Sequence, residues 1–329
     1  GGQCVPSTCW GRHSQTAYVR GPSQRRGRVA VADRQTVLIA GGNGNVGGGA
    51  AVALARRGAE IVLLGRKTSA LEARADRIRT ELSDRAPADL AIETLEVDLS
   101  DQDSVRRAAV EALERFPSID GLIHSVVYLG QHGPTIGSDG HERTFATNVI
   151  GPFLLTQLLM DRLERSEAMV LHVVAPFYED IDWDDLESIA DYDGEKPYHR
   201  TKTMNRMMAA ELARRYEGRI SSVAFDPGFI IDKHDPTLKD RWPSGFTGFY
   251  WRVLTALVAK PPKVAGEPIA DLMLSTPDRQ SVNGALFKLG KRVTKPDKAM
   301  IDEAAGRRLW DELVRMTEST PGLGTGAEG

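Results

Sequence analysis

The 329-residue sequence predicts an α/β fold, a doubly wound parallel sheet in a single domain, on three observations. From Thr36 onward, short apolar segments alternate with longer segments whose apolar residues recur at helical spacing. The apolar segments lack polar alternation, as expected for parallel strands that are buried on both faces. The first of them runs directly into a glycine-dense turn and a helix. Strands and helices that alternate in this way build a parallel sheet with helices on both faces.

Taken in order, the apolar segments predict strands and the periodic segments between them predict helices. We expect strands at 37–40, 61–64, 92–97, 120–126, 168–174, 219–225 and 284–289. We expect helices at 47–57, 68–84, 102–115, 140–165, 197–216, 248–259, 263–275 and 303–316. The acidic stretch 176–197 is expected to be a surface excursion between a strand and a helix.

Composition narrows the class of protein. The chain is 41% hydrophobic and 26% charged with a formal net charge of -3, which argues against a nucleic-acid partner. No apolar run approaches the roughly eighteen residues that a membrane span requires. Both cysteines, Cys4 and Cys9, fall in the first ten residues, so the folded body is expected to have no disulfide and no thiolate chemistry. We therefore expect a cytoplasmic protein, and a homo-oligomer stays open.

The ends of the chain differ from its centre. Residues 1–34 carry six arginines against one acid, Asp33, and show no sustained period. They suit a basic arm for an anionic partner, or an unfolded or non-native extension, and we exclude them from the fold. The folded domain is expected over 35–318, followed by a flexible tail at 319–329. Within it, 229–262 gathers five aromatic residues between positions 242 and 251, which form either a lid over a substrate or ordinary packing.

The glycine-dense turn predicts a nucleotide site. A strand, a glycine turn and a helix together bind a dinucleotide, because the backbone approaches the phosphates and the helix N-terminus attracts the anion. The next strand ends in Gly65-Arg66-Lys67, with no acidic residue where a ribose would lie. Two cations at that point suit a 2′-phosphate, so we expect NADP. The expected contacts from these segments are Gly41, Asn43, Gly44, Asn45, Val46, Gly47, Arg66 and Lys67.

A tyrosine and a lysine near position 200 predict acid–base chemistry. Tyr198 and Lys202 are four residues apart, so both side chains lie on one face of the expected helix. A nearby cation stabilises phenolate and lowers a tyrosine pKa from about 10 toward neutrality, as a general acid/base requires. A solvated lysine beside a packing tyrosine is the alternative.

Several motifs in one order resemble the short-chain dehydrogenase/reductase family, and most closely its retinol-dehydrogenase-like branch. The resemblance extends from about Thr36 to about Met316 and includes the glycine turn and the Tyr198…Lys202 pair. Further matching segments are Asp98-Leu99, the central helix 139–156 with its Asn148, the acidic insertion 181–186, Asp226-Pro227-Gly228, and the closing helix around 308–311.

The resemblance implies a Rossmann fold and a mechanism. Tyr198 would exchange a proton with a carbonyl or alcohol oxygen as hydride passes to or from the nicotinamide. Lys202 would lower the tyrosine pKa and hold the ribose, and Asn148 would fix a water that links Lys202 to solvent. The family pattern also places Asp98, Leu99, Ser125, Pro227, Gly228 and Ile230 against the cofactor.

The chain departs from the family pattern at four places. Asn45 replaces the second glycine of the turn, His124-Ser125-Val126-Val127 replaces Asn-Asn-Ala-Gly, and Asp232 replaces a threonine. The family's substrate-orienting serine aligns with Ala175, so that hydroxyl is missing. Losing one donor to an oxyanion costs about a hundred- to a thousandfold in rate. The candidates for a replacement donor are Tyr178, Ser125 and His172.

Two functions therefore remain open. The first is an NADP-dependent oxidoreductase that interconverts a carbonyl and an alcohol on a bulky, largely apolar small molecule. The second keeps the cofactor pocket but runs non-redox chemistry, namely cyclisation, dehydration or isomerisation, with Tyr198 as acid/base. The intact tyrosine, lysine and asparagine argue against a catalytically silent protein. No metal site is expected, since the histidines form no ligand motif, and the acidic run 179–185 suits a solvated loop better than a cation site.

Overall fold

The computed structural model describes residues 34–83, 90–130, 133–190, 192–193, 195–233, 258–276 and 278–317. In this part of the chain an eight-stranded sheet has the order β3-β2-β1-β4-β5-β6-β7-β8. All neighbouring strands are parallel except β7 and β8, which are antiparallel. The strands are β1 (Thr36–Ala40), β2 (Glu60–Gly65), β3 (Ile92–Glu96), β4 (Gly121–His124), β5 (Met169–Val173), β6 (Ser221–Asp226), β7 (Leu286–Lys288) and β8 (Lys291–Arg292). The predicted α/β fold is confirmed.

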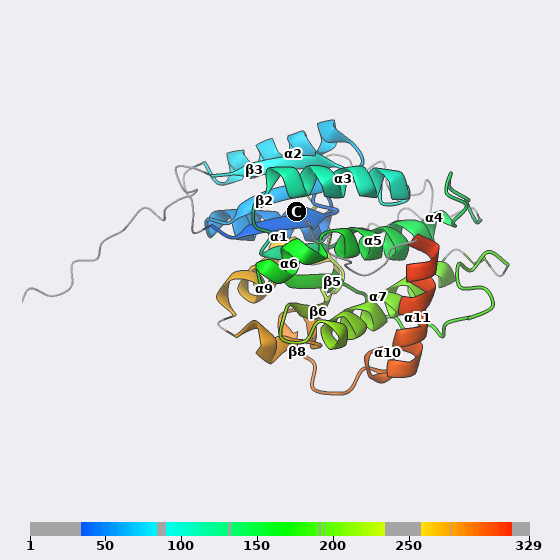
Figure 1. Ribbon diagram of the computed structural model, residues 1–329. Helices are drawn as coiled ribbons and strands as arrows, with labels where there is room; N and C mark the ends of the chain where they lie inside the picture. Colours follow the sequence, from blue (N-terminus) through cyan, green and yellow to red (C-terminus); the bar gives the residue numbers. More distant parts are fainter. Residues whose placement is uncertain are drawn as a thin grey trace, which may run out of the picture. The chain divides into compact units, whose positions relative to one another are not determined.

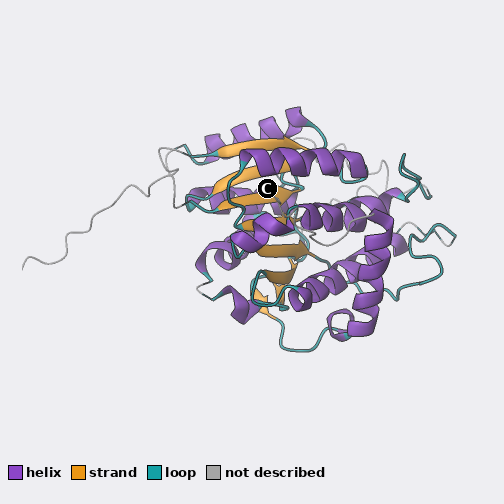
Figure 2. Ribbon diagram, viewed as in Figure 1, coloured by secondary structure: helices purple, strands orange, loops and turns teal. Residues whose placement is uncertain are grey.

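Helices cover both faces of the sheet (Figures 1 and 2). Val37 and Ile39 of β1 belong to a core shared with α1 (Asn45–Arg56), α2 (Thr68–Glu81) and α9 (Lys263–Ser275). Leu38 and Ala40 belong to the core of the opposite face. That face is covered by α3 (Gln102–Arg115), α5 (Gly151–Leu158), α6 (Met160–Arg165), α7 (Lys196–Arg215) and α11 (Glu303–Thr317). The strands are thus apolar on both sides, which explains their lack of alternation.

The helix predicted at 140–165 is present from Arg143 to Arg165, but it is not a single regular helix. The helical segment begins with α4 (Arg143–Phe145), widens into a π-helix at Ala146–Ile150, continues as α5, and is interrupted at Leu159 before α6. Pro152 has no amide hydrogen, so it cannot donate to the carbonyl of Asn148 four residues earlier. The π-helix absorbs this mismatch and contains Asn148 itself.

Three short elements were not predicted, because two to four residues are too few to show a helical or strand periodicity in their apolar residues. They are β8, a 3₁₀ turn at Arg279–Val282 and α10 (Lys298–Ile301). The expected terminal segments 1–34 and 319–329 lie almost wholly outside the described residues, as does most of the expected lid at 229–262 and helix at 248–259. Among the described helices, none combines the length and the apolarity needed to cross a membrane.

A close contact between two helices fixes the position of α1. A Cβ added at Gly266 of α9 would lie 2.2 Å from the carbonyl oxygen of Gly49 in α1. Only a glycine permits this approach of the two backbones. The N-terminus of α1, which follows the glycine turn, is therefore held against α9 and the sheet.

Candidate active site

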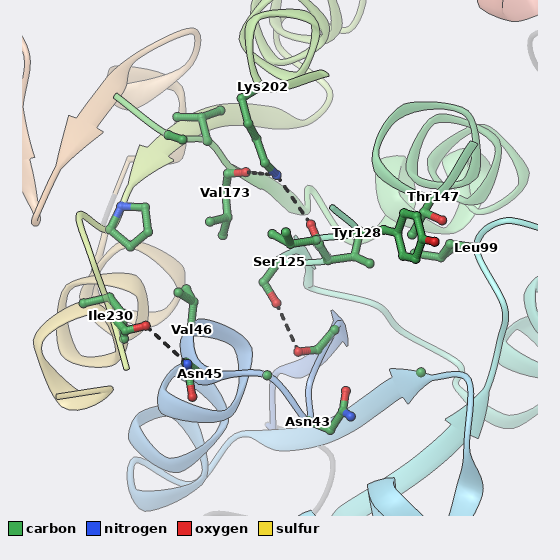
Figure 3. Close-up of a pocket in the computed structure, with 18 of the residues that line it drawn as sticks. Asn43, Asn45, Val46, Leu99, Ser125, Tyr128, Thr147, Val173, Lys202 and Ile230 are labelled. Atoms are coloured by element: carbon green, nitrogen blue, oxygen red, sulfur yellow. Dashed lines mark hydrogen bonds between the residues drawn. The ribbon is translucent and has the colours of Figure 1, made fainter. Parts of the chain in front are cut away.

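A cavity of about 860 Å³ lies at the carboxyl ends of the parallel strands (Figure 3). Its walls come mainly from the segments that directly follow β1, β2, β3, β4, β5 and β6. In open α/β sheets, ligands bind in the crevice outside these strand ends. The cavity is therefore the site that the fold itself favours.

The glycine turn and the start of α1 form one end of this cavity. A Cβ at Gly47 would lie 2.4 Å from both the carbonyl oxygen of Gly41 and the Oγ of Ser125, so the turn requires glycine there. The N-cap of α1 is Gly44, and no side chain caps the helix. The first N–H groups of a helix have no partner within the helix and favour an anion. The geometry of this end fits a phosphate group.

Three cations surround the same end. Arg66 and Lys67 are exposed, follow β2 and line the cavity. The Nη2 of Arg74, on α2, donates to the carbonyl oxygen of Gly44 at 2.9 Å and so braces the turn. Sequence reasoning missed Arg74 because nothing distinguishes it from the other arginines of an exposed helix. The positive charge at this end favours a phosphorylated ligand.

Tyr198 and Lys202 belong to α7, and both line the part of the cavity away from the glycine turn. The Nζ of Lys202 lies 5.6 Å from the centroid of the tyrosine ring and donates to the carbonyl oxygens of Val173 at 3.3 Å and Val126 at 3.4 Å (Figure 3). The predicted helical face is confirmed, since both side chains reach one cavity.

The electrostatics of this pair differ from expectation. Burial lowers the pKa of Lys202 to about 8. Burial, together with the negative charge of Asp226, raises the pKa of Tyr198 to about 12. The expected lowering of the tyrosine pKa is thus not seen, because desolvation of the hydroxyl outweighs an ammonium that is directed at backbone carbonyls. The tyrosine holds its proton at neutral pH.

Three predicted residues do not line the cavity. Asn148 clamps the backbone of Tyr128, which does line it, by accepting from its N–H at 2.8 Å and donating to its carbonyl at 2.9 Å. Asp98 accepts from the N–H and the hydroxyl of Ser100, so it shapes its own turn. Gly47 has no side chain, and this absence is what allows the close packing of the turn against Gly41 and Ser125. The other predicted cofactor contacts all line the cavity: Gly41, Asn43, Gly44, Asn45, Val46, Arg66, Lys67, Leu99, Ser125, Tyr198, Lys202, Pro227, Gly228 and Ile230.

Ala175 lines the cavity, and none of the candidate replacement donors is placed to act there. The Ser125 hydroxyl donates to the carbonyl of Ala40 at 2.8 Å. His172 is 2% exposed, and neither it nor Tyr178 lines the cavity. Arg206 instead donates to the backbone carbonyls of Ala175 and Phe177, which fixes this wall of the site.

Other polar residues singled out by sequence have structural contacts. His141 pairs with Glu187 at 2.9 Å, and His199 stacks on Phe177. In the acidic loop, Asp182 and Asp185 accept hydrogen bonds from backbone N–H groups of the loop itself. No group of three or more His, Cys, Asp or Glu side chains in the described part of the chain is arranged to hold a metal ion.

Comparisons with known proteins define the class. A model of the short chain dehydrogenase family matches residues 35–179. Retinol dehydrogenase 14 of Homo sapiens is 31% identical over 306 residues, covering 88% of this chain and 88% of that protein. Retinol dehydrogenase 13 of Mus musculus is 29% identical over 309 residues, covering 88% of this chain and 87% of that protein.

A solved structure supports the fold. A short chain dehydrogenase from Shigella flexneri, complexed with NADP, aligns with a TM-score of 0.56 at 20% identity, covering 78% of this chain and 97% of that chain. The chain belongs to the short-chain dehydrogenase/reductase family and is an oxidoreductase of that family.

Proposed function

We propose that the protein is an NADP-dependent oxidoreductase that interconverts a carbonyl and an alcohol on a bulky, largely apolar small molecule. The observation that carries this proposal is the placement of Tyr198 and Lys202 in the same cavity as the uncapped N-terminus of α1 and the cations Arg66 and Lys67. The residues present fit NADP at its phosphates, and the bound cofactor would supply or accept the hydride.

Tyr198 is in the protonation state that reduction of a carbonyl requires. Its hydroxyl stays protonated at neutral pH, so it can donate a proton to the oxygen of a carbonyl substrate. Lys202 lies close enough to stabilise the phenolate that this donation leaves behind. Asn148 holds the backbone of Tyr128 in the cavity wall and so positions the substrate side of the site.

The apolar substrate class is supported by the walls near Tyr198. They include Val127, Phe177 and Phe229, which are 54%, 47% and 41% exposed. Large apolar side chains that remain exposed around a cavity indicate a binding surface for an apolar ligand. The retinol dehydrogenases to which the chain is similar carry the name of an apolar alcohol, which agrees with this proposal.

The alternative is non-redox chemistry on the same scaffold, and Ala175 favours it. No hydroxyl from that position can orient a carbonyl oxygen, while proton transfer by Tyr198 remains available. In this second function the cofactor would bind without being consumed.

The test is consumption of NADPH in the presence of a panel of lipophilic aldehydes and ketones. We expect absorbance loss equal to product formed, abolished by Tyr198→Phe. Product formed at constant absorbance would decide for the alternative.

Cofactor preference is tested separately by calorimetry. We expect NADPH to bind about tenfold or more tightly than NADH, because charge-assisted contacts contribute roughly 1.5–3 kcal/mol. The double variant Arg66→Ala/Lys67→Ala should remove this preference, whereas Arg79→Ala, which breaks an exposed ion pair with Asp76 elsewhere on α2, should keep it. Equal affinities in the unmodified protein would contradict the assignment of NADP.

A further inference from the structure

Two of the residues at which the chain departs from its family pattern are joined across the cavity. The side-chain amide of Asn45, the first residue of α1, donates to the carbonyl of Ile230 at 3.2 Å (Figure 3). Its oxygen accepts from the N–H of Asp232 at 3.3 Å. Asn45, Ile230 and Ile231 all line the cavity, so this pair of hydrogen bonds connects the wall at α1 to the wall after β6.

The same segment is held at two further points. The carboxylate of Asp232, whose side chain is 13% exposed, pairs with Arg77 of α2 at 3.1 Å. The N–H of Ile231 donates to the carbonyl of Lys260 at 3.0 Å, and the N–H of Lys260 donates to the carbonyl of Phe229 at 2.9 Å. Residues 230–232 are therefore tied to α1, to α2 and to the segment before α9.

We propose that Asn45, Asp232 and Arg77 form a clasp that closes residues 230–232 over the nucleotide end of the cavity and limits the rates at which the cofactor binds and leaves. The clasp spans the end that contains the start of α1, which is where the phosphates of a dinucleotide fit. The inference rests on the proposed function, because its ligand is NADPH.

The chemistry of the two departures explains why both are needed. A glycine at position 45 has no side chain to reach the 230–232 backbone, and a threonine at position 232 has no charge to pair with Arg77. Asn45 supplies both a donor and an acceptor, so it binds the backbone of this segment as a neighbouring strand would. Asp232 then anchors the far side of the segment to α2.

A clasp makes a kinetic prediction that differs from a direct contact with the cofactor. A clasp that must open for both binding and release slows the two rates by the same factor and leaves the dissociation constant unchanged. A side chain that contacts only the bound nucleotide changes mainly the dissociation rate. Rate constants therefore separate the two roles, where affinity alone would not.

The experiment measures association and dissociation of NADPH by stopped-flow fluorescence in Asn45→Gly, Asp232→Thr and the double variant. We expect each single variant to raise both rate constants about tenfold, as expected for the loss of one or two hydrogen bonds or an ion pair. In Asp232→Thr, which changes a residue outside the cavity lining, the dissociation constant should change less than about threefold. The double variant should resemble Asn45→Gly, because both changes open the same clasp.

Asp76→Thr is the matched control, since it breaks the ion pair with Arg79 on the same helix without touching the clasp. Unchanged rates in both single variants, or a rise in dissociation alone, would overturn the clasp while leaving the cofactor assignment standing. Failure of the unmodified protein to bind NADPH would instead remove the proposed function and, with it, this inference. Circular dichroism of each variant confirms that the fold is intact.

Discussion

At the scale of single residues, the departures from the family pattern do not have one common cause. Asn45 and Asp232 make specific contacts with the chain itself, whereas Ala175 lines the cavity and offers no polar group. Arg206 binds the backbone behind Ala175, so the wall is held in place without a serine hydroxyl. The residue that decides between the two proposed functions is therefore Ala175.

Ala175→Ser should raise NADPH-dependent carbonyl reduction by about ten- to a thousandfold, because one well-placed donor to an oxyanion has this effect. Steady-state kinetics with the best carbonyl substrate measures it. Ala175→Cys, similar in size but a weak donor, is the control and should gain little. A serine variant whose native activity stays flat or falls, while Tyr198→Phe still abolishes that activity, would favour non-redox chemistry.

The pH dependence of reduction should follow Lys202 rather than Tyr198. Lys202, with a pKa of about 8, loses its charge as the pH rises through that value, whereas Tyr198, with a pKa of about 12, keeps its proton. We therefore expect kcat/KM to fall on the alkaline side near pH 8. In Asp226→Asn the pKa of Tyr198 should drop, yet the pH at which kcat/KM falls should not change. A fall of kcat/KM at lower pH in this variant would show that Tyr198 itself titrates there.

At the scale of elements, the site depends on contacts that sequence periodicity does not reveal. Periodicity found the helix that contains Asn148 but not its π-helical turn, because the cause is one missing amide hydrogen at Pro152. It found α1 and α9 but not their contact at Gly49 and Gly266, because residues more than two hundred positions apart meet only in the fold. The π-helical turn contains Asn148, which holds the cavity wall at Tyr128, and the contact at Gly266 holds α1, whose N-terminus lines the cavity.

Gly266→Ala should destabilise the protein by about 1–3 kcal/mol or more, since its new methyl group meets a backbone oxygen that cannot move aside. Gly306→Ala on α11 is the matched control. Its methyl would lie 2.9 Å from the far end of the flexible Arg214 side chain and 3.5 Å from the Glu211 carboxylate, which is ordinary contact, and alanine is the better helix former by roughly 0.5–1 kcal/mol. Chemical denaturation of both variants should therefore give shifts of opposite sign. Equal stability of the two variants would contradict the close packing of α1 on α9.

At the scale of the whole molecule, the sequence predicted the sheet, most of its helices and about half of the residues that line the cavity. It did so because buried parallel strands and glycine turns leave patterns that are local in sequence. It did not predict the raised pKa of Tyr198 or the bracing by Arg74, since these depend on burial and on distances between segments. It also did not predict the paired histidines His124 and His172, which lie opposite each other on β4 and β5 with ring centroids 5.2 Å apart.

These buried histidines should make the free energy of unfolding decrease as the pH falls. Burial lowers the pKa of His172 to about 3 and that of His124 well below its usual value. In the unfolded chain a histidine binds a proton below about pH 6.5. Between about pH 6.5 and pH 3 the unfolded state therefore binds more protons at His172 than the folded state does, so stability falls as the pH falls, by about 1.4 kcal/mol per pH unit for this histidine. The lowered pKa of His124 acts in the same direction.

His172→Phe keeps an aromatic ring beside His124 and removes one titrating group. In urea unfolding from pH 4 to pH 6, we expect the slope of unfolding free energy against pH to decrease by about 1.4 kcal/mol per pH unit, whatever the variant costs in packing. Leu171→Val, a packing change on the same strand, should lower stability without changing that slope. An unchanged slope in His172→Phe would mean that His172 takes up its proton in the folded state, and thus that the core around β4 and β5 opens to water above pH 4.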